Sequence, residues 1–221
     1  MRQDPPTTLK ELEVRAAALA GHTVLALADA LGVEVPRESR RAKGFVGQLA
    51  EAALGAAANA GDGPDFPALQ VELKTIPLLA SGRPRESTFC CSIQMARSDR
   101  EEWRSSRLRR RLQQVLWLPV IGGRGTAVAL RRFGRATLWR PTPVEEQLLC
   151  ADWEDLMGRI AAGRVPSAHH GVALQVRPKA PTRDARSLAP GDDGPRLTLP
   201  LGFYLRASFT ATILRAAPTS D

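Results

Sequence analysis

The chain has 221 residues, 43% of them hydrophobic, and a formal net charge of +8. This length suits one domain with a real core, and the positive charge favours a polyanionic partner, nucleic acid before membrane. The longest apolar stretch, residues 115–121, is too short to span a membrane, and the N-terminus lacks the apolar core of a signal peptide. Three cysteines, two of them adjacent, form neither a disulfide framework nor a zinc-ligand pattern. We therefore expect a reduced, cytoplasmic protein with no membrane association.

Hydrophobic periodicity and capping residues predict helices and strands along the whole chain, without internal repeats. Thr7 or Thr8 is expected to cap the first helix, and Gly32 to end the second. In chain order, the predicted elements are helices at residues 8–20, 24–31 and 44–58, a loop at 61–64, strands at 69–77 and 87–95, a basic helix at 106–114, strands at 115–121 and 137–140, a helix at 143–163, a strand at 173–179, a polar loop at 181–195, and a segment at 197–204 that leads into a helix from residue 208.

The most informative segment runs from Asp65 to Lys74. Valine and leucine alternate with Glu72 and Lys74, which is the period-two pattern of a half-buried strand. Glu72 and Lys74 would share one face, about 6.6 Å apart, while the apolar side chains point to the other. Asp65 can join them only if the chain turns between, because seven extended residues span roughly 23 Å. Pro67 is well suited to begin such a turn.

Two carboxylates and an ammonium at this spacing are typical of a metal-dependent site that cleaves phosphodiesters. Carboxylate oxygens suit Mg²⁺ and leave positions open for water and a phosphate oxygen. Lys74 would orient that water or stabilise the anionic transition state. The chain has four lysines against 27 arginines, yet it places lysine here, where a compact ammonium differs from a forked guanidinium. The alternative is chance spacing or a charged pair on a solvated edge strand.

Further candidate residues lie outside this segment. Glu51 on the preceding helix could supply another carboxylate, or it could be an ordinary exposed charge. Phe89 and Tyr204 fit core packing. Pro178 is expected to end strand pairing and to direct its neighbours outward. Basic clusters that acidic residues do not balance are candidates for phosphate contacts, against the alternative of a solvated surface. These are Arg104, Arg107, Arg109, Arg110 and Arg111; Arg131, Arg132 and Arg135; and Arg177 with Lys179.

Several short stretches run in a recognisable order over nearly the whole chain. They are residues 43–51 (KGFVGQLAE), 65–66, 71–77 (VELKTIP), 82–84, 88–89, 115–120 (VLWLPV), 152–157 (DWEDLM), 174–180 (LQVRPKA) and 197–205 (LTLPLGFYL). Together they resemble the MutH family of mismatch-repair endonucleases, within the PD-(D/E)xK restriction-endonuclease-like superfamily. The resemblance implies an α/β fold of restriction-endonuclease type, with a mixed sheet flanked by helices. In such a fold, residues 1–221 would form a single two-lobed domain around a DNA cleft.

The resemblance also implies an activity and its partners. It implies Mg²⁺-dependent nicking of the unmethylated strand of double-stranded DNA at hemimethylated GATC sites, 5′ to the G. The enzyme would be a monomer that MutL activates after MutS has found a mismatch. Asp65 and Glu72 match the metal ligands, Lys74 matches the catalytic lysine, and Glu51 and Lys43 match auxiliary active-site positions. The positions that match DNA contacts are Arg177, Pro178 and Lys179 in the base-reading loop, Phe89 near the DNA, Tyr204 as the sensor of adenine methylation, and Arg111, where the family has lysine.

Two other functions compete with this one. A type II restriction endonuclease that cuts GATC shares the fold and the motif, but such enzymes usually pair two active sites, and one site in one chain fits a nickase better. A non-catalytic DNA-binding module is disfavoured by the intact set of Asp65, Glu72 and Lys74. Methylation sensitivity and the form of the product distinguish the first alternative, and metal-dependent nicking distinguishes the second.

Overall fold

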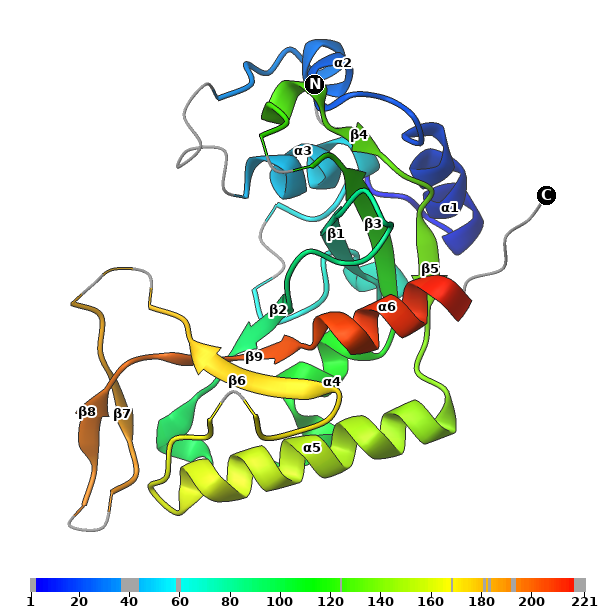
Figure 1. Cartoon of the computed structure of the whole chain (residues 1–221). Coiled ribbons are helices and arrows are strands. Elements are labelled where there is room, and N and C mark those ends of the chain that lie inside the picture. The colour runs from blue at the N-terminus through cyan, green and yellow to red at the C-terminus, as the bar shows by residue number, and fades with distance from the viewer. Residues whose placement is uncertain are drawn as a thin grey trace. The chain divides into compact units, whose positions relative to one another are not determined.

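The chain forms two compact units, whose elements are drawn in Figure 1. The computed structural model describes residues 3–36, 44–58, 61–123, 125–167, 169–180, 182, 184–191 and 194–216. The predicted cleft between two lobes of one domain concerns how the units are placed, and it stays a prediction. The first unit comprises Met1–Glu86, Gln113–Arg140 and Ile213–Asp221, and the second comprises Ser87–Leu112 and Pro141–Thr212.

The first unit is built on a mixed sheet. Its β1 (Glu72–Leu78) pairs in parallel with β3 (Val115–Ile121). β3 also pairs antiparallel with β4 (Arg132–Phe133) and β5 (Thr137–Trp139). The strands predicted at the positions of β1, β3 and β5 are confirmed, and Arg132 lies in β4, a strand that the sequence analysis did not predict. Among the described residues, β1 stands at the end of the strand order, so its other side is a sheet edge.

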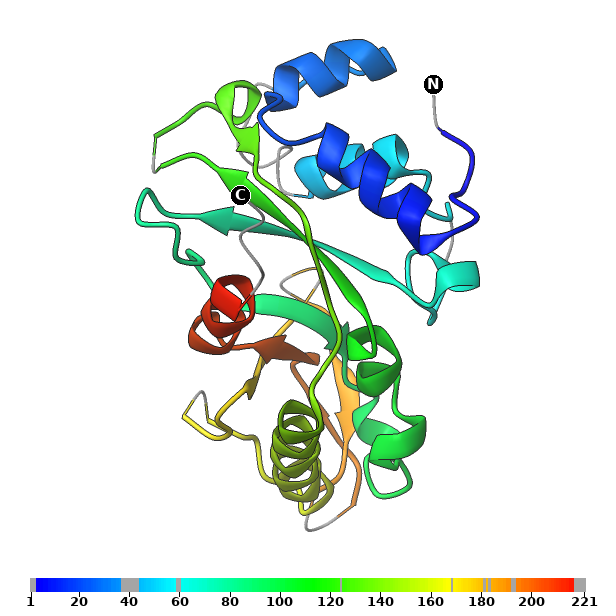
Figure 2. The ribbon, with the colours of Figure 1, turned by 90° about the vertical axis from the view of Figure 1, so that its right-hand side faces the viewer.

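Three helices, α1 (Leu9–Ala18), α2 (Val24–Leu31) and α3 (Phe45–Leu54), cover one face of this sheet (Figure 2). Thr8 and Thr23 cap the first two by accepting backbone N–H bonds from the first turn, so the predicted cap at Thr8 is confirmed. Glycines in the left-handed conformation end α2 and α3. For this reason α3 ends before residue 58, where the sequence predicted its end.

The core of the first unit lies between these helices and the sheet. Leu12 and Leu54 are fully buried there, and Leu73 of β1 is 6% exposed. Burying each such side chain contributes roughly 1.5–3 kcal/mol. Because side chains alternate along a strand, the contact of Leu73 with the helices directs Glu72 and Lys74 to the opposite face of the sheet.

The second unit contains an antiparallel sheet with β9 (Leu201–Leu205) in its centre. β2 (Thr88–Ser92) pairs with one side of β9, and β6 (Leu174–Pro178) pairs with the other. The helices of this unit are α4 (Arg107–Leu112), α5 (Pro143–Ala161) and the start of α6 (Ala207–Ala216), with short 3-10 turns η2 (Met95–Arg97) and η3 (Trp103–Ser105). Helices and sheets together confirm the predicted α/β class, with a mixed sheet flanked by helices.

A hairpin of β7 (Ser187–Ala189) and β8 (Arg196–Thr198) occupies part of the segment that was predicted to be a polar loop. The loop prediction was therefore wrong for β7. Leu188 faces Leu197 across the two strands, and such apolar cross-strand pairs stabilise short ladders. Among the described residues, no helix is both long enough and apolar enough to cross a membrane. The cytoplasmic location stays a prediction.

Asp152 of α5 anchors the start of β6. Its carboxylate accepts backbone N–H bonds from Val172 at 2.9 Å, Ala173 at 2.6 Å and Leu174 at 2.7 Å. The Asp152 side chain is buried, so these bonds replace the water that the charged group lost. The anchor fixes where the strand that carries Arg177 begins.

We expect Asp152→Asn to lower the free energy of unfolding by about 2–4 kcal/mol, because the amide is uncharged and sets an NH₂ group among backbone donors. Asp155→Asn on the same helix is the matched control. Its carboxylate is about half exposed and contacts Arg159 four residues later, so its loss should change stability little. Urea unfolding of both variants, followed by circular dichroism, provides the measurement. Equal effects of the two changes would contradict the anchoring role.

Candidate active site

A tight turn brings Asp65 back to the start of β1. Phe66 and Val71 exchange backbone hydrogen bonds of 2.9 and 3.2 Å, and Pro67–Leu69 forms a 3-10 turn between them. Gln70 closes the turn with a φ of 55°, in the left-handed region that few residues other than glycine adopt. The turn predicted at Pro67 is confirmed.

Backbone geometry places the Asp65 carboxylate on the free edge of β1. Glu72 N–H donates to the carbonyl of Gln114, immediately before β3, at 2.9 Å. Successive N–H groups of a strand point to opposite sides, so Leu73 N–H points away from β3. Its acceptor is Asp65 Oδ2 at 2.8 Å. Asp65 and Glu72 therefore meet at the same end of the same strand.

Glu72 and Lys74 form an ion pair inside the first unit. Lys74 Nζ lies 2.5 Å from Glu72 Oε1, and the two side chains are 14% and 1% exposed. The expectation of a half-buried strand with both charges on its open face was wrong, because this face of β1 is covered as well. The alternative of a pair on a solvated edge is excluded by the same burial. A buried carboxylate is stable only when it is paired, and Lys74 provides the charge.

The donor set fits a hard cation that shares its coordination with water and phosphate. Asp65 and Glu72 offer carboxylate oxygens, the ligands that Mg²⁺ prefers, and they leave most positions around the ion to the substrate. Within the described ranges, no group of three or more His, Cys, Asp or Glu side chains is arranged to hold a metal. Glu51 is half-buried on α3, and its auxiliary role stays a prediction. Lys43 lies outside the described residues.

The sheet of the second unit carries alternating aromatic and cationic side chains on one face. Phe89 and Tyr204 stand opposite each other on β2 and β9, with ring centroids 5.3 Å apart. Arg177 lies 5.8 Å from the centroid of the Tyr204 ring, and Lys179 Nζ lies 4.8 Å from that of Phe89. Arg177 also donates to Ser87 Oγ at 3.0 Å. Cation–aromatic contacts of this kind hold both basic side chains in place.

Three sequence expectations for this face need correction. Pro178 does not end strand pairing: it stays in register with Leu201, and Lys179 N–H donates to the Pro200 carbonyl at 2.7 Å. A proline is tolerated there because it occupies a position from which no N–H is required. Residues 201–205, which overlap the segment expected only to lead into the last helix, form the strand β9, and Tyr204 lies within it. Tyr204, like its partner ring, is half-buried rather than part of the core.

Gly202 was not singled out from the sequence, although it shapes this face. A Cβ atom at this position would lie 2.8 Å from Phe89 Cε2, 3.2 Å from the Cys91 carbonyl oxygen and 3.3 Å from Lys179 Cβ. Only glycine leaves room for the ring and for the lysine stem above β9. The signal that could have found it is a glycine inside the apolar run 201–205, because a glycine within a strand often marks a close approach.

The arginine side chains of the basic helix α4 are less available to bind phosphate than the sequence suggested. Arg109 Nε pairs with Glu146 Oε1 at 2.6 Å, and the same oxygen accepts from Trp103 Nε1 at 3.0 Å. Arg110 is exposed and Arg111 is half-buried. Burial raises the pKa of the nearby Glu101 carboxyl, and the charge of Arg110 opposes this effect. Arg109 is thus held by Glu146, and the phosphate contacts predicted for Arg109, Arg110 and Arg111 stay predictions.

Comparison with known proteins gives a consistent result. A family model described as "DNA mismatch repair enzyme MutH" matches residues 54–152. DNA mismatch repair protein MutH from Serratia proteamaculans (strain 568) is 45% identical over 213 residues, which is 95% of this chain and 93% of that protein. The protein of the same name from Shewanella baltica (strain OS185) is 46% identical over 213 residues, 95% of this chain and 96% of its own. That from Enterobacter sp. (strain 638) is 42% identical over 215 residues, with 96% and 94% covered.

The close approach at Gly202 yields a prediction. Gly202→Ala should displace the Phe89 ring and so shift the ring resonances of Tyr204, the one tyrosine in the sequence. NMR of tyrosine-labelled protein reads this signal without overlap. Gly158→Ala, where a Cβ meets nothing within 4 Å, is the matched control and should leave the signal in place. An unchanged Tyr204 signal in Gly202→Ala would mean that the face does not depend on the glycine.

Proposed function

Because the chain belongs to the MutH family of DNA mismatch repair enzymes, we propose that it is a Mg²⁺-dependent endonuclease that nicks DNA at hemimethylated GATC sites. The cut falls on the unmethylated strand, 5′ to the G. The observation that carries this proposal is the convergence of Asp65, Glu72 and Lys74 at the start of β1. Such a set binds a metal, holds a phosphate and positions a water.

Each residue of this set has a distinct role. Asp65 and Glu72 hold the metal, one from the edge of β1 and the other from its face. When bound, Mg²⁺ supplies positive charge to the phosphate and makes water more acidic. Lys74 donates hydrogen bonds to the attacking water or to an anionic phosphate oxygen, as a point charge already held beside Glu72. Glu51 and Lys43 serve as auxiliary residues.

The aromatic and basic face of the second unit reads the site. Arg177 and Lys179 have donors suited to base edges, and their contacts with Tyr204 and Phe89 reduce the entropy lost when they bind DNA. Pro178 is exposed between them and keeps the strand extended. Tyr204 gauges the adenine by contact with its amino group, and Arg111 contacts a backbone phosphate.

The family also supplies the proposed partners and setting. MutL activates the enzyme after MutS has found a mismatch, and the enzyme acts as a cytoplasmic monomer. A type II restriction endonuclease for GATC is the second candidate, but the described residues contain one set of Asp65, Glu72 and Lys74, which suits a nick in one strand. A DNA-binding module without catalysis would have no use for a buried ion pair beside a second carboxylate.

Nicking of a supercoiled plasmid that carries GATC sites tests the activity. We expect Asp65→Asn and Glu72→Gln to abolish Mg²⁺-dependent nicking while DNA affinity is kept or increased, because negative charge near the phosphate is removed. Glu13→Gln, an exposed carboxylate on α1, is the control and should nick normally. Nicking by either active-site variant would overturn the ligand assignment, and double-strand breaks from the unaltered enzyme would favour the restriction enzyme.

Tyr204 yields a separate prediction about methylation. A methyl group on adenine N6 projects into the major groove, where a closely packed ring rejects it by crowding. Tyr204→Ala should therefore nick methylated and unmethylated strands at more similar rates, with lower activity overall. Strand-resolved nicking of unmethylated, hemimethylated and fully methylated GATC duplexes measures this. Unchanged strand preference would place the methyl sensor elsewhere.

A further inference from the structure

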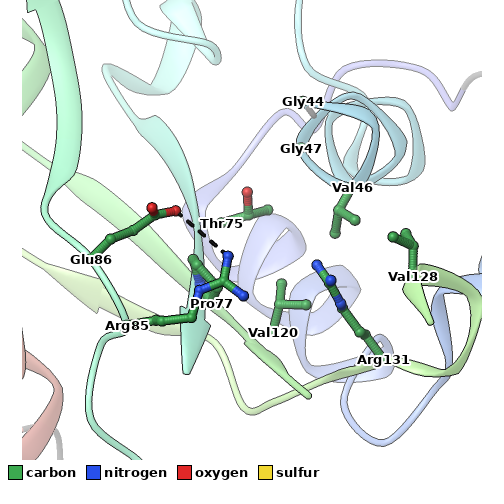
Figure 3. A pocket seen from close by; sticks show the side chains of 10 residues that line it. All are labelled: Gly44, Val46, Gly47, Thr75, Pro77, Arg85, Glu86, Val120, Val128 and Arg131. Atoms are coloured by element: carbon green, nitrogen blue, oxygen red, sulfur yellow. Dashed lines mark ion pairs between the residues drawn. The ribbon is translucent and has the colours of Figure 1, made fainter. Parts of the chain in front are cut away.

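A hollow of about 500 Å³ opens on the first unit, beside the first turn of α3. Figure 3 shows the side chains that line it, with the guanidinium groups of Arg85 and Arg131 both directed inward. Val46, Pro77 and Val120 form an apolar floor. The side chains of β1 that line it belong to positions 75 and 77, so they lie on the opposite face of the strand from Glu72 and Lys74. The hollow is therefore separate from the carboxylate pair.

Arg131 is held so that its charge points into the hollow. A Cβ atom at Gly122 would lie 2.7 Å from Arg131 Cγ, so the glycine makes room for the arginine stem. Arg131 Nε donates to the Thr126 carbonyl at 3.4 Å. Within the described part of the chain, its two terminal nitrogens have no hydrogen-bond or ion-pair partner. A guanidinium held at its base and open at its tip is suited to an anion.

Arg85 and Thr75 complete the polar lining. The backbone N–H of Arg85 donates to the Pro77 carbonyl at 2.9 Å, which ties this arginine to the end of β1. Its guanidinium lies 4.0 Å from the exposed Glu86 carboxylate. This ion pair is long and open to solvent, so it leaves hydrogen-bond donors of the guanidinium available. The Thr75 hydroxyl donates to no acceptor among the described residues. Two cations and a hydroxyl thus face a hollow with one carboxylate at its rim.

We propose that this hollow seats one sugar-phosphate unit of the DNA backbone, away from the scissile phosphate. The phosphate would lie between Arg85 and Arg131, and the apolar face of the sugar would lie on Pro77 and Val120. Guanidinium groups read phosphate and not base identity in this setting, so the contact is independent of sequence. The inference rests on the proposed function, since it requires DNA to be the substrate.

The surroundings limit how far the backbone follows this surface. A second hollow shares Val128 and Arg131 with the first and carries Asp29 and Glu34. A polyanion is repelled there, so the DNA strand would cross the first hollow rather than continue along η4 (Val128–Leu130). The hollow thus binds one backbone unit. The competing occupant of its apolar part is a segment of a partner protein.

Equilibrium binding as a function of salt tests the proposal, with GATC and scrambled duplexes compared. One phosphate contact contributes about 0.9 to the slope of log affinity against log salt, so the double variant Arg85→Ala/Arg131→Ala should flatten the slope by about that amount, and each single variant by part of it. Affinity for both duplexes should fall by the same factor. Arg131→Gln keeps much of the stem and covers the case in which the alanine variant does not fold. Matched controls are Arg83→Ala, an exposed arginine two residues before Arg85, and Arg159→Ala, whose guanidinium is paired with Asp155.

The remaining outcomes are decisive. An unchanged salt slope in Arg85→Ala and Arg131→Gln overturns the proposed phosphate site. Loss of partner-stimulated nicking in those variants would then identify a protein segment as the occupant of the hollow. Equal flattening in the controls also overturns the phosphate site, because the effect would be one of total charge. A loss confined to the GATC duplex would make the arginines base readers. Failure of the proposed function is distinguishable, since the unaltered enzyme would then neither bind nor nick DNA.

Discussion

The buried ion pair of Glu72 and Lys74 is the constraint on which the first unit depends. A carboxylate that is 1% exposed costs several kcal/mol of desolvation unless a cation is fixed beside it. The pair fixes its own geometry because both residues lie on one strand, two positions apart. Parallel pairing with β3 then holds that strand in register, and Leu73 N–H is left on the edge to receive Asp65. The geometry of the proposed catalytic set and the strand register are thus set by the same contacts.

The second unit positions its charges differently. Arg177 and Lys179 remain accessible and gain order from the aromatic rings of Tyr204 and Phe89 rather than from buried counter-charges. This arrangement suits the base-reading role proposed for the two residues, since the cations keep most of their hydrogen-bonding capacity. The positions of the two cations depend on two other features. One is the close approach of Phe89 and Lys179 to Gly202, and the other is the anchor that Asp152 provides where β6 begins.

Local patterns predicted most of what is local in the chain. Period-two alternation located β1, a threonine cap located the start of α1, Gly32 located the end of α2, and Pro67 located the turn that returns Asp65 to the strand. The family resemblance supplied the fold class. What failed was non-local: the burial of Glu72 depends on what covers the second face of β1. Gly202 likewise gains its role only when β2, more than 100 residues earlier, brings Phe89 beside it.

The use of lysine in a chain that otherwise prefers arginine has the same physical basis at both sites. At position 74 a guanidinium is wider than an ammonium and spreads its charge, so it could not place one compact cation on a buried Glu72 oxygen without opening the strand face. At position 179 the stem passes over Gly202, where a Cβ atom would already be crowded, and the ammonium ends on the Phe89 ring. Arginine is found instead where a planar guanidinium with several donors fits, as at Arg177 over Tyr204 and at the hollow lined by Arg85 and Arg131. The choice between the two cations therefore follows the space and the shape of the group that each one meets.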